Sequence, residues 1–593
     1  MNTLFKEKCK ALLFLPQKKL TQKQFIIFSS IVVGLFVGLA AIALKTFAHF
    51  ILVSVTFSQD GVYKYLYLAL PMVGILLTLL VIKTFLKNKL DKGLSHVHYA
   101  IAKKSSVIPK EQTYAQILTS SLTVGFGGSA GLEAPIVITG AAFGANYSKS
   151  FQLTYKERTL LLACGVAAGI GATFNAPIAG VLFALEVLLI DISITAFAPL
   201  ILAAASGALI SKIILENEIL LSFEMNQPFN YHNVPFYLVL GVCAGAVSVY
   251  HARVFTKIEK IFHNTKSNIY RNAILGGVFL GILILIFPTL FGEGFNSIKL
   301  LAQQKPEEIL NNSLFQHFQN NESVVLIAVG VLIFAKTIAT AITIGSGGNG
   351  GNFAPSLFIG AYLGFFFSKL INSFHLSHLP ISNFTLVGMA GVLSGLYHAP
   401  LTAIFLIAEI TGGYSLIIPL MLVSSISFAI SKYFESYPMD TKSLSLKGDI
   451  FTSDRDHNVL TTIDVKQLIE TNFQLISPNY TLGQLVEIIS KSRRNIFPVI
   501  NDKNDFLGII ILDDIRDIIF KTELYNILIV NELMINPPAV ILSTESMEEV
   551  MKKFDETEAW NLPVTENGKY LGFISKSSVF SSYRLKLKDG IIE

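Results

Sequence analysis

Long apolar runs, separated by short polar segments, dominate positions 1–440 of the chain. Some of these runs are nearly uninterrupted, and most of them approach or exceed the ~20 residues that an α-helix needs to cross a bilayer. These runs are 25–47, 63–85, 236–255, 273–290, 324–344 and 416–430. Other apolar stretches are interrupted by glycine and proline, namely 114–147, 159–190, 196–215, 353–372 and 384–412. The pattern predicts an all-α polytopic membrane protein with broken helices, which are tolerated where their ends line a cavity inside the protein.

The remainder of the chain, 441–593, follows a different pattern, in which two similar segments succeed each other. Residues 473–520 and 533–580 both read as a strand, an amphipathic helix of period near 3.6, two strands joined by an Asx/Gly turn, and a helix. The matched landmarks are FPVINDKNDFLGII at 497–510 and LPVTENGKYLGFI at 562–574. The pattern predicts a small α/β tail built from two repeats.

Composition separates the same two regions. The 593 residues are 52% apolar and 15% charged, whereas an ordinary soluble protein is about 25% charged. Residues 441–593 hold 17 Lys+Arg and 22 Asp+Glu, a net charge of −5, while residues 1–440 hold 29 and 19, a net charge of +10. The tail is therefore composed like a soluble domain. The basic first part indicates loops beside lipid rather than a nucleic-acid partner.

The beginning of the chain sets the expected orientation. Residues 1–24 are rich in lysine, and their apolar run at 11–16 is too short for a signal peptide. The positive-inside rule places this segment, and with it the tail, in the cytoplasm, beneath a cell membrane that the chain crosses several times. The expected divisions are a basic segment at 1–24, a transmembrane domain at 25–436, a linker at 437–460 and tail repeats at 461–523 and 524–593.

An internal repeat indicates how the apolar part is built. ATFNAPIAGVLFALEVL at 172–188 matches SGLYHAPLTAIFLIAEI at 394–410, so that Ala176 aligns with Ala399. Upstream, GGSAGLEAP at 127–135 matches GGNGGNFAP at 347–355, so that Pro135 aligns with Pro355. The two motifs recur in the same order and at nearly the same offset. Paired halves that carry Gly/Pro-interrupted segments in corresponding places predict a transport site between them.

The most informative single residue is Glu133, a carboxylate inside the apolar run 122–143. Such a group costs several kcal/mol if it stays ionised in lipid, so it indicates a functional site. Glu186 and Glu409 end their apolar runs, where an interfacial structural role is expected.

Two glycine clusters, GFGGSAG at 125–131 and GSGGNGG at 345–351, each precede a helix-like run. Glycine lets backbone N–H groups converge at the start of a helix, where the helix dipole favours an anion. Neither cluster contains Lys or Arg. An anion held only by partial charges binds weakly enough to leave again, which conduction requires.

Together these motifs resemble the CLC family of chloride channels and chloride/proton exchangers, and the tail resembles the paired CBS domains of many members. GLEAP at 131–135 is similar to the family's G-(K/R)-E-G-P motif, which implies that Glu133 is the gating glutamate and that Gly131 lies beside the anion. GGNFAP is similar to G-x-F-x-P, which implies that the backbone amides of Asn352 and Phe353 hold chloride. The resemblance also implies inverted repeats and a homodimer with one pore per subunit.

Three departures from the family pattern bear on function. The first family motif, G-S-G-x-P, falls on DKGLSHVHYAIA at 91–102, where gapless matching places Lys92 at the anion-coordinating serine and Ser95 nearby. The pore tyrosine is expected near the end of the membrane domain, with Tyr437 as the candidate. The internal proton glutamate of the exchangers falls on Val187, the residue type of the family's channels.

Val187 favours a passive, glutamate-gated chloride channel. A chloride/proton antiporter is the alternative if Glu186 or a chain of waters relays protons instead. A second alternative is a nucleotide sensor that regulates an anion pathway, because each tail repeat keeps half of the nucleotide motif G-h-x-(S/T)-x-x-D: Asp514 in the first and Ser575 in the second. No nucleophile–base pair or metal-ligand spacing predicts an enzyme or a metal site. Besides chloride, the sequence suggests one ligand, an adenosine nucleotide at the tail, and the alternative interpretation of the tail is a purely structural dimerisation module.

Overall fold

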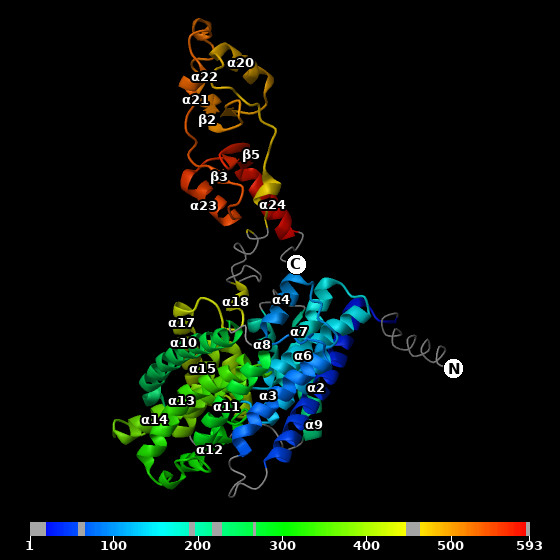
Figure 1. Ribbon diagram of the computed structural model, residues 1–593, viewed down its shortest axis with the longest axis vertical. Coiled ribbons are helices and arrows are strands. Elements are labelled where there is room, and N and C mark those ends of the chain that lie inside the picture. The colour runs from blue at the N-terminus through cyan, green and yellow to red at the C-terminus, as the bar shows by residue number, and fades with distance from the viewer. Residues whose placement is uncertain are drawn as a thin grey trace, which may run out of the picture. The chain divides into compact units, whose positions relative to one another are not determined.

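The computed structural model of the chain describes residues 19–56, 66–188, 196–215, 228–264, 268–445, 460 and 463–588. The chain divides into two compact units, Met1–Ile450 and Phe451–Glu593. We refer to them as the helical unit and the tail unit and describe each by itself (Figure 1).

Two similar series of helices make up the helical unit. The first series is α2 (Gln22–Val55), α3 (Leu66–Thr84), α4 (Ser95–Lys103), α5 (Gln112–Gly125), α6 (Glu133–Ser150), α7 (Tyr155–Phe174), α8 (Pro177–Val187) and α9 (Phe197–Leu215). The second is α10 (Val234–Asn264), α11 (Ile269–Ile286), α12 (Phe295–Ala302), α13 (Glu322–Gly345), α14 (Phe353–Ser373), α15 (Ile381–Tyr397), α16 (Pro400–Ile410) and α17 (Ile417–Phe434), followed by α18 (Lys442–Ser445). Short 3-10 helices are η3 (Tyr231–Asn233), η4 (Pro288–Leu290), η5 (Pro306–Leu310) and η6 (Gln316–Phe318).

Within the described ranges, nine helices are long and apolar enough to cross a membrane. Helices α8 and α16 have only 11 residues each and cannot do so alone. The predicted breaks in the apolar stretches are therefore real helix ends. Figure 1 shows the first series in blue to cyan and the second in green to yellow, side by side.

The same local device breaks the helices in both halves. Helix α7 ends before Asn175, whose backbone is left-handed at φ 54°, and α8 begins at Pro177. Helix α15 ends before His398, left-handed at φ 55°, and α16 begins at Pro400. A left-handed residue terminates a helix, and proline is suited to the first helical position because it lacks the N–H that would remain unpaired there. The Ala-Pro repeat therefore marks two equivalent breaks.

Close helix crossings bury the core of this unit. Helices α6 and α7 pack against each other, as do α14 and α15. A Cβ on Gly140 would lie 2.3 Å from the carbonyl oxygen of Gly165, and one on Gly360 would lie 2.4 Å from that of Gly388. These glycines occupy equivalent positions of the two repeats, so both crossings use backbone contact that a larger residue would prevent.

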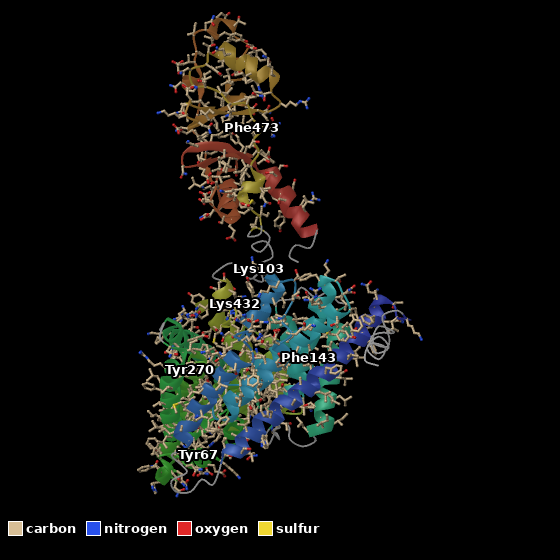
Figure 2. The ribbon with its side chains drawn as sticks, turned by 45° about the vertical axis from the view of Figure 1, so that its right-hand side comes forward. Tyr67, Lys103, Phe143, Tyr270, Lys432 and Phe473 are labelled. Carbon is tan, nitrogen blue, oxygen red and sulfur yellow. The ribbon has the colours of Figure 1, made fainter. Side chains whose placement is uncertain are left out.

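The two ends of the helical unit can be told apart in Figure 2. Lys103 at the end of α4 and Lys432 near the end of α17 lie toward one end, and Tyr67 at the start of α3 lies toward the other. We call these the lysine end and the Tyr67 end.

Strands and short helices make up the tail unit. The strands are β1 (Ile496–Ile500), β2 (Phe506–Ile511), β3 (Ile541–Leu542), β4 (Asn561–Glu566) and β5 (Lys569–Ser575). The helices are η7 (Val465–Leu468), α20 (Leu482–Lys491), α21 (Leu512–Ile515), η8 (Thr522–Leu524), α22 (Val530–Leu533), α23 (Met547–Thr557) and α24 (Lys576–Lys588).

Both tail repeats are organised around an antiparallel hairpin. Strand β1 pairs with β2, and β4 pairs with β5 and, in parallel, with β3. The strand expected before α20 is reduced to one bridge between Ile476 and Val499. Capping boxes at Thr481 and Ser546 begin α20 and α23 at matching places. The predicted fold class, a helical first part and an α/β tail of two repeats, is confirmed.

Candidate anion site

The two glycine-rich segments meet in the buried interior of the helical unit. The N–H of Gly131 donates to the carbonyl of Gly351 at 2.9 Å, and the N–H of Gly351 donates to the carbonyl of Gly131 at 2.9 Å. The two glycines occupy the same place in the repeated motifs GLEAP and GGNFAP. A contact in which two equivalent residues bond each other reciprocally is the mark of two-fold symmetry. The pairing therefore joins the two halves at their equivalent motifs.

A second reciprocal pair fixes the same junction. The N–H of Ser129 donates to the hydroxyl of Thr343 at 3.1 Å, and the N–H of Asn349 donates to the hydroxyl of Thr123 at 3.0 Å. All four residues are buried. These bonds satisfy turn amides that would otherwise be unpaired away from water, so the start of each following helix is rigidly placed.

Helices α6 and α14 begin directly after the junction, at Glu133 and Phe353. The first N–H groups of a helix have no intrahelical partner and carry the positive end of the helix dipole. The N–H groups of Asn352 and Phe353 have no hydrogen-bond acceptor among the described residues. The start of α14 therefore offers free backbone donors to an anion.

The carboxylate of Glu133 lies at this same helix start. The residue is 1% exposed, and its Oε2 accepts a bond from the N–H of Ala354 at 3.3 Å. Its Oε1 is buried and has no partner in the described part of the chain. A Cβ on Gly131 would lie 2.2 Å from Oε2, so only glycine leaves room for the carboxylate there. The side chain thus holds a negative charge where an anion would bind.

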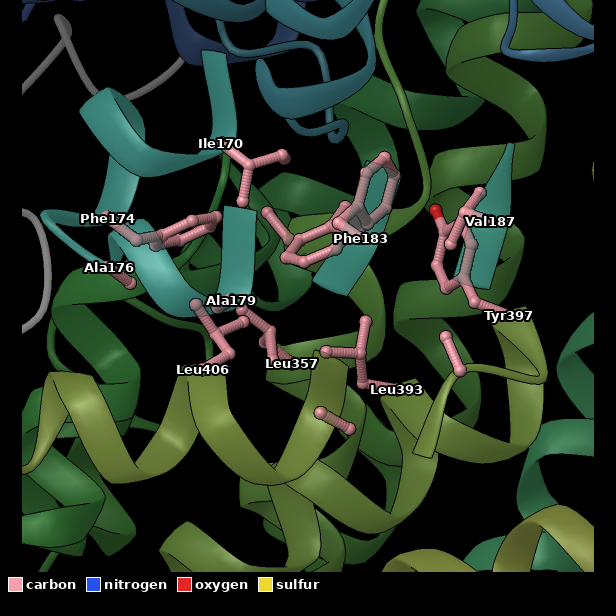
Figure 3. Close-up of a cluster of buried hydrophobic side chains, with 14 of the residues drawn as sticks. Ile170, Phe174, Ala176, Ala179, Phe183, Val187, Leu357, Leu393, Tyr397 and Leu406 are labelled. Carbon is pink, nitrogen blue, oxygen red and sulfur yellow. The ribbon is translucent and has the colours of Figure 1, made fainter. Parts of the chain in front are cut away.

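Aromatic rings surround the side chain of Phe353. Its ring centroid lies 5.5 Å from that of Phe174, 5.9 Å from that of Phe183 and 5.6 Å from that of Tyr397. Figure 3 shows Phe174, Phe183 and Tyr397 among the buried side chains of this region. Tyr397 in LYHAP takes the place that Phe174 takes in TFNAP of the first repeat. The repeat therefore brings two equivalent aromatic residues to one ring.

The phenol beside Phe353 belongs to Tyr397, which the sequence analysis did not select. Tyr437 lies half-buried between α17 and α18, and no ring contact or hydrogen bond of its side chain is found among the described residues. The local signal was the position of Tyr397 in SGLYHAP, immediately before the second helix break. Tyr437 stays a prediction, and Tyr397 is the second candidate for a pore phenol.

Lys92 lies just before α4, which begins at Ser95. Its ammonium donates to the carbonyls of Gly347 at 2.6 Å and Gly348 at 3.0 Å, within the second glycine cluster. An ammonium has three donors, so one remains for another acceptor. Ser95 is half-buried and forms the first turn of α4. Of the two candidates for the place of the family serine, Lys92 is the one bonded to the glycine cluster.

Glu186 of the first repeat caps the start of α16 in the second repeat, and Glu409 of the second repeat caps the start of α8 in the first. Glu186 at the end of α8 accepts bonds from the N–H groups of Leu401 at 2.9 Å and Thr402 at 2.7 Å, which begin α16. Glu409 at the end of α16 accepts bonds from the first N–H groups of α8 at 3.0 and 2.8 Å. Each carboxylate therefore stabilises the start of the other short helix. Val187, the next residue after Glu186, is buried in the apolar core with Tyr397 (Figure 3).

Three further charged residues near the junction were missed by sequence reasoning. Lys336 of α13 is 0% exposed, and its ammonium donates to the Ser129 hydroxyl at 2.9 Å and the Gly292 carbonyl at 3.0 Å. Glu293 and Lys45 lie close enough to Glu133 to act on it electrostatically. The signal for Lys336 was its place inside the apolar run 324–344, since an ionisable group in a membrane helix is rare.

In the tail unit, Ser575 is engaged in hydrogen bonds that do not include Asp514. The hydroxyl of Ser575 donates to Glu470 at 2.7 Å and accepts from the N–H of Ser578 at 3.0 Å. Arg494 pairs with Glu470 at 2.9 Å. Asp514 is exposed on α21. The half-motifs therefore do not form a joint hydrogen-bonded site in this structure, and nucleotide binding stays a prediction.

Comparisons with known proteins identify both units. The family described as "Voltage gated chloride channel" matches residues 73–432, and the CBS domain family matches 465–521 and 530–584. The chain is 27% identical over 450 residues to the Arabidopsis thaliana chloride channel protein CLC-f, covering 67% of this chain but only 56% of that relative's length. It is 27% identical to the H(+)/Cl(-) exchange transporter ClcA of Klebsiella pneumoniae, covering 70% of this chain and 87% of that protein.

A solved structure shares the architecture. The crystal structure of a eukaryotic CLC transporter superposes with a TM-score of 0.60 at 18% identity, covering 93% of this chain and 97% of that one. At this identity the likeness shows the fold alone. The family match spans more than half of the chain and includes the meeting point of α6 and α14. The helical unit is therefore a multi-pass membrane domain, and the chain belongs to the voltage-gated chloride channel family, the CLC family of anion-transport proteins, with a pair of CBS domains at its end.

Proposed function

We propose that this chain is a passive chloride channel gated by the carboxylate of Glu133. The observation that carries the proposal is the bond between this carboxylate and the N–H of Ala354 at the start of α14. The neighbouring N–H groups of Asn352 and Phe353 are the free donors that would hold the permeating anion. An anion and the tethered carboxylate then compete for the same positive helix end.

Gating follows from this competition. While ionised, Glu133 occupies the helix start and excludes chloride. Protonation removes its charge, which weakens its bond to the Ala354 N–H and lets an anion take its place. The phenol of Tyr397 and the ammonium of Lys92 add donors at the border of this site, with Tyr437, Ser95 and Gly131 as further candidate contacts.

Proton coupling is the point that separates a channel from an exchanger. Val187 cannot carry a proton, and the carboxylate of Glu186 is bonded to two N–H groups and the hydroxyl of Thr402 at 2.7 Å. A carboxylate engaged in capping is poorly placed to pass protons onward. A chloride/proton antiporter is the second candidate function, and it is favoured by the likeness to the ClcA exchange transporter.

A flux measurement tests the anion pathway itself. Purified protein in liposomes should release internal chloride once a potassium ionophore permits charge balance, and the reversal potential should follow the chloride gradient. Replacement of external chloride by gluconate should abolish inward flux. Reversal at the potassium or sodium potential, or no protein-dependent flux, would reject the proposal.

We also propose a cellular arrangement. The lysine end of the helical unit faces the cytoplasm, as the positive-inside rule expects, in the cell membrane, and two subunits each hold one pore. The CBS pair then serves as a cytoplasmic regulatory domain. Cysteine-accessibility labelling at positions 103 and 67, which lie toward opposite ends of the helical unit, would show which end faces the cytoplasm.

Backbone rather than side-chain donors should hold the anion at α14. Replacing Asn352 with Ala should change the chloride affinity by less than about 1 kcal/mol, because the N–H remains. Replacing Phe353 with Pro should abolish binding, since proline is accepted at the first helical position but has no N–H. Calorimetric titration with chloride measures both, and Phe353→Leu is the control that loses the ring and keeps the donor. Tight binding by the proline variant contradicts the assignment.

The ammonium of Lys92 should strengthen anion binding. Lys92→Met removes the charge with little change of length, and it should weaken chloride binding by roughly tenfold, as expected for one partly screened charge at close range. Lys89→Met is the matched control, because Lys89 is 61% exposed and pairs with Glu111 at the surface. Equal chloride affinities of the two variants would show that Lys92 does not contribute to anion binding.

A further inference from the structure

A second carboxylate lies at the start of α6. Glu293 follows η4 in the segment that leads to α12, and its Oε1 accepts a bond from the N–H of Leu132 at 3.2 Å. Leu132 is the cap residue of α6, directly before Glu133. Each of the two helix starts at the junction therefore binds a carboxylate: α14 binds that of Glu133, and α6 binds that of Glu293.

Two lysines interact electrostatically with this second carboxylate. Lys336, which is completely buried, and Lys45 of α2 both act electrostatically on Glu293 and on Glu133. The ammonium of Lys45 donates to the carbonyl of Thr173, and that of Lys336 lies 4.9 Å from the ring centroid of Phe358. Two acids and two cations balance each other, which offsets the cost of burying charge.

A ring contact shows near which end of the helical unit the Glu293 segment lies. The ring of Phe291, two positions before Glu293, lies 5.6 Å from that of Tyr67. The segment that carries Glu293 therefore lies beside the start of α3, where Tyr67 marks one end of the unit (Figure 2). Glu293 is half-buried, whereas Glu133 is closed off.

The equivalent segment of the first repeat carries the opposite charge. Lys92 precedes α4 and donates to the Gly347 carbonyl, while Glu293 precedes α12 and accepts from an N–H beside the first glycine cluster. At the α4 side an ammonium is thus available to an anion. At the α12 side the carboxylate of Glu293 already accepts the hydrogen bond of the Leu132 N–H, so this donor is not free for an anion.

We propose that Glu293 is a second gating carboxylate, a tethered anion that occupies the Leu132 N–H on the route between Glu133 and the Tyr67 end. A permeating anion has to displace the Glu293 carboxylate from this N–H. Once the carboxylate has moved, Lys45 and Lys336 are the cations that attract the anion. Protonation of Glu293 removes the competing charge, as protonation of Glu133 does. The inference rests on the proposed gating by Glu133 and adds a second titrating step to it.

Chloride flux from proteoliposomes between pH 4.5 and 8 tests the two steps. In Glu293→Gln the loss of one charge-assisted bond should raise flux at pH 7.5 by about fivefold and make its rise on acidification shallower. Glu133→Gln alone should keep a residual pH dependence, and the double variant should have none. Glu307→Gln is the matched control, because Glu307 is exposed on η5, beyond the cluster.

The outcomes separate the inference from the function on which it rests. If Glu293→Gln behaves like Glu307→Gln and Glu133→Gln is already independent of pH, Glu293 has no gating role and the proposed function stands. If Glu133→Gln keeps the full wild-type dependence, the proposed function fails. Should Glu293→Gln not fold, Glu293→Asp keeps the charge but shortens the reach to the Leu132 N–H. It should raise flux and retain two titrating steps, and wild-type flux in that variant overturns the inference.

Discussion

Glu133→Gln should raise chloride flux at pH 7.5 by roughly tenfold, the equivalent of losing one bond between a carboxylate and a backbone N–H. The amide has the size of the carboxylate but no charge, so it competes poorly with chloride for the start of α14. Wild-type flux should rise as pH falls, because acid protonates the carboxylate and creates the same neutral state. In the variant most of that rise should be absent.

Proteoliposome efflux at stepped pH measures this directly. Glu322→Gln is a suitable control, since Glu322 begins α13 with 81% of its side chain exposed and pairs only with Lys369 among the described residues. A Glu133→Gln variant with the wild-type pH profile and wild-type flux would show that this carboxylate does not gate the pathway.

The repeated motifs were predictable because their chemistry is local. A glutamate between glycine and proline in an apolar run, or an Ala-Pro pair before an apolar helix, can be recognised without knowing what lies beside it. The structure adds that equivalent residues bond each other, as Gly131 does with Gly351. The near-constant offset between the paired motifs indicated two related halves but not that these motifs would touch.

The partners of these motifs were not predictable, because they come from elements far away in the chain. Tyr397 reaches Phe353 only because α15 packs against α14. Lys336 and Glu293 become members of one cluster through contacts with the first glycine segment, which is distant from both of them in the sequence. A single-sequence pattern contains no information on such contacts. The rule on intramembrane charge could have marked Lys336, and nothing local marked Glu293 as more than a loop residue.

The role of Glu186 also depended on a distant contact. The sequence placed it at the end of an apolar run beside Val187, which left an interfacial structural role and a proton relay open. The bonds to Leu401 and Thr402 favour capping, because they use both oxygens of the carboxylate. The same argument applies to Glu409 in the other half, so the two short helices stabilise each other.

Chloride flow through this protein should not pump protons in a fixed ratio. Coupled transport needs a titratable group on the proton route through the membrane domain, because a proton in dry protein meets a large solvation cost. Val187 lies buried in the apolar core at the position where such a group is expected, and Glu186 is held at the start of α16. The carboxylates of Glu133 and Glu293 accept backbone bonds at the starts of α14 and α6, where the two halves meet.

Vesicles with a chloride gradient and a pH-sensitive dye inside test this expectation. A chloride gradient should dissipate without driving protons uphill, and the reversal potential should not shift when a pH gradient is imposed at constant chloride. Val187→Glu adds a titratable group at this position. Val187→Thr is its control, because threonine has nearly the shape of valine and adds no titratable group. Uphill proton movement by the wild type would reject the channel assignment, and its loss in Glu186→Gln with chloride flux retained would identify Glu186 as the relay.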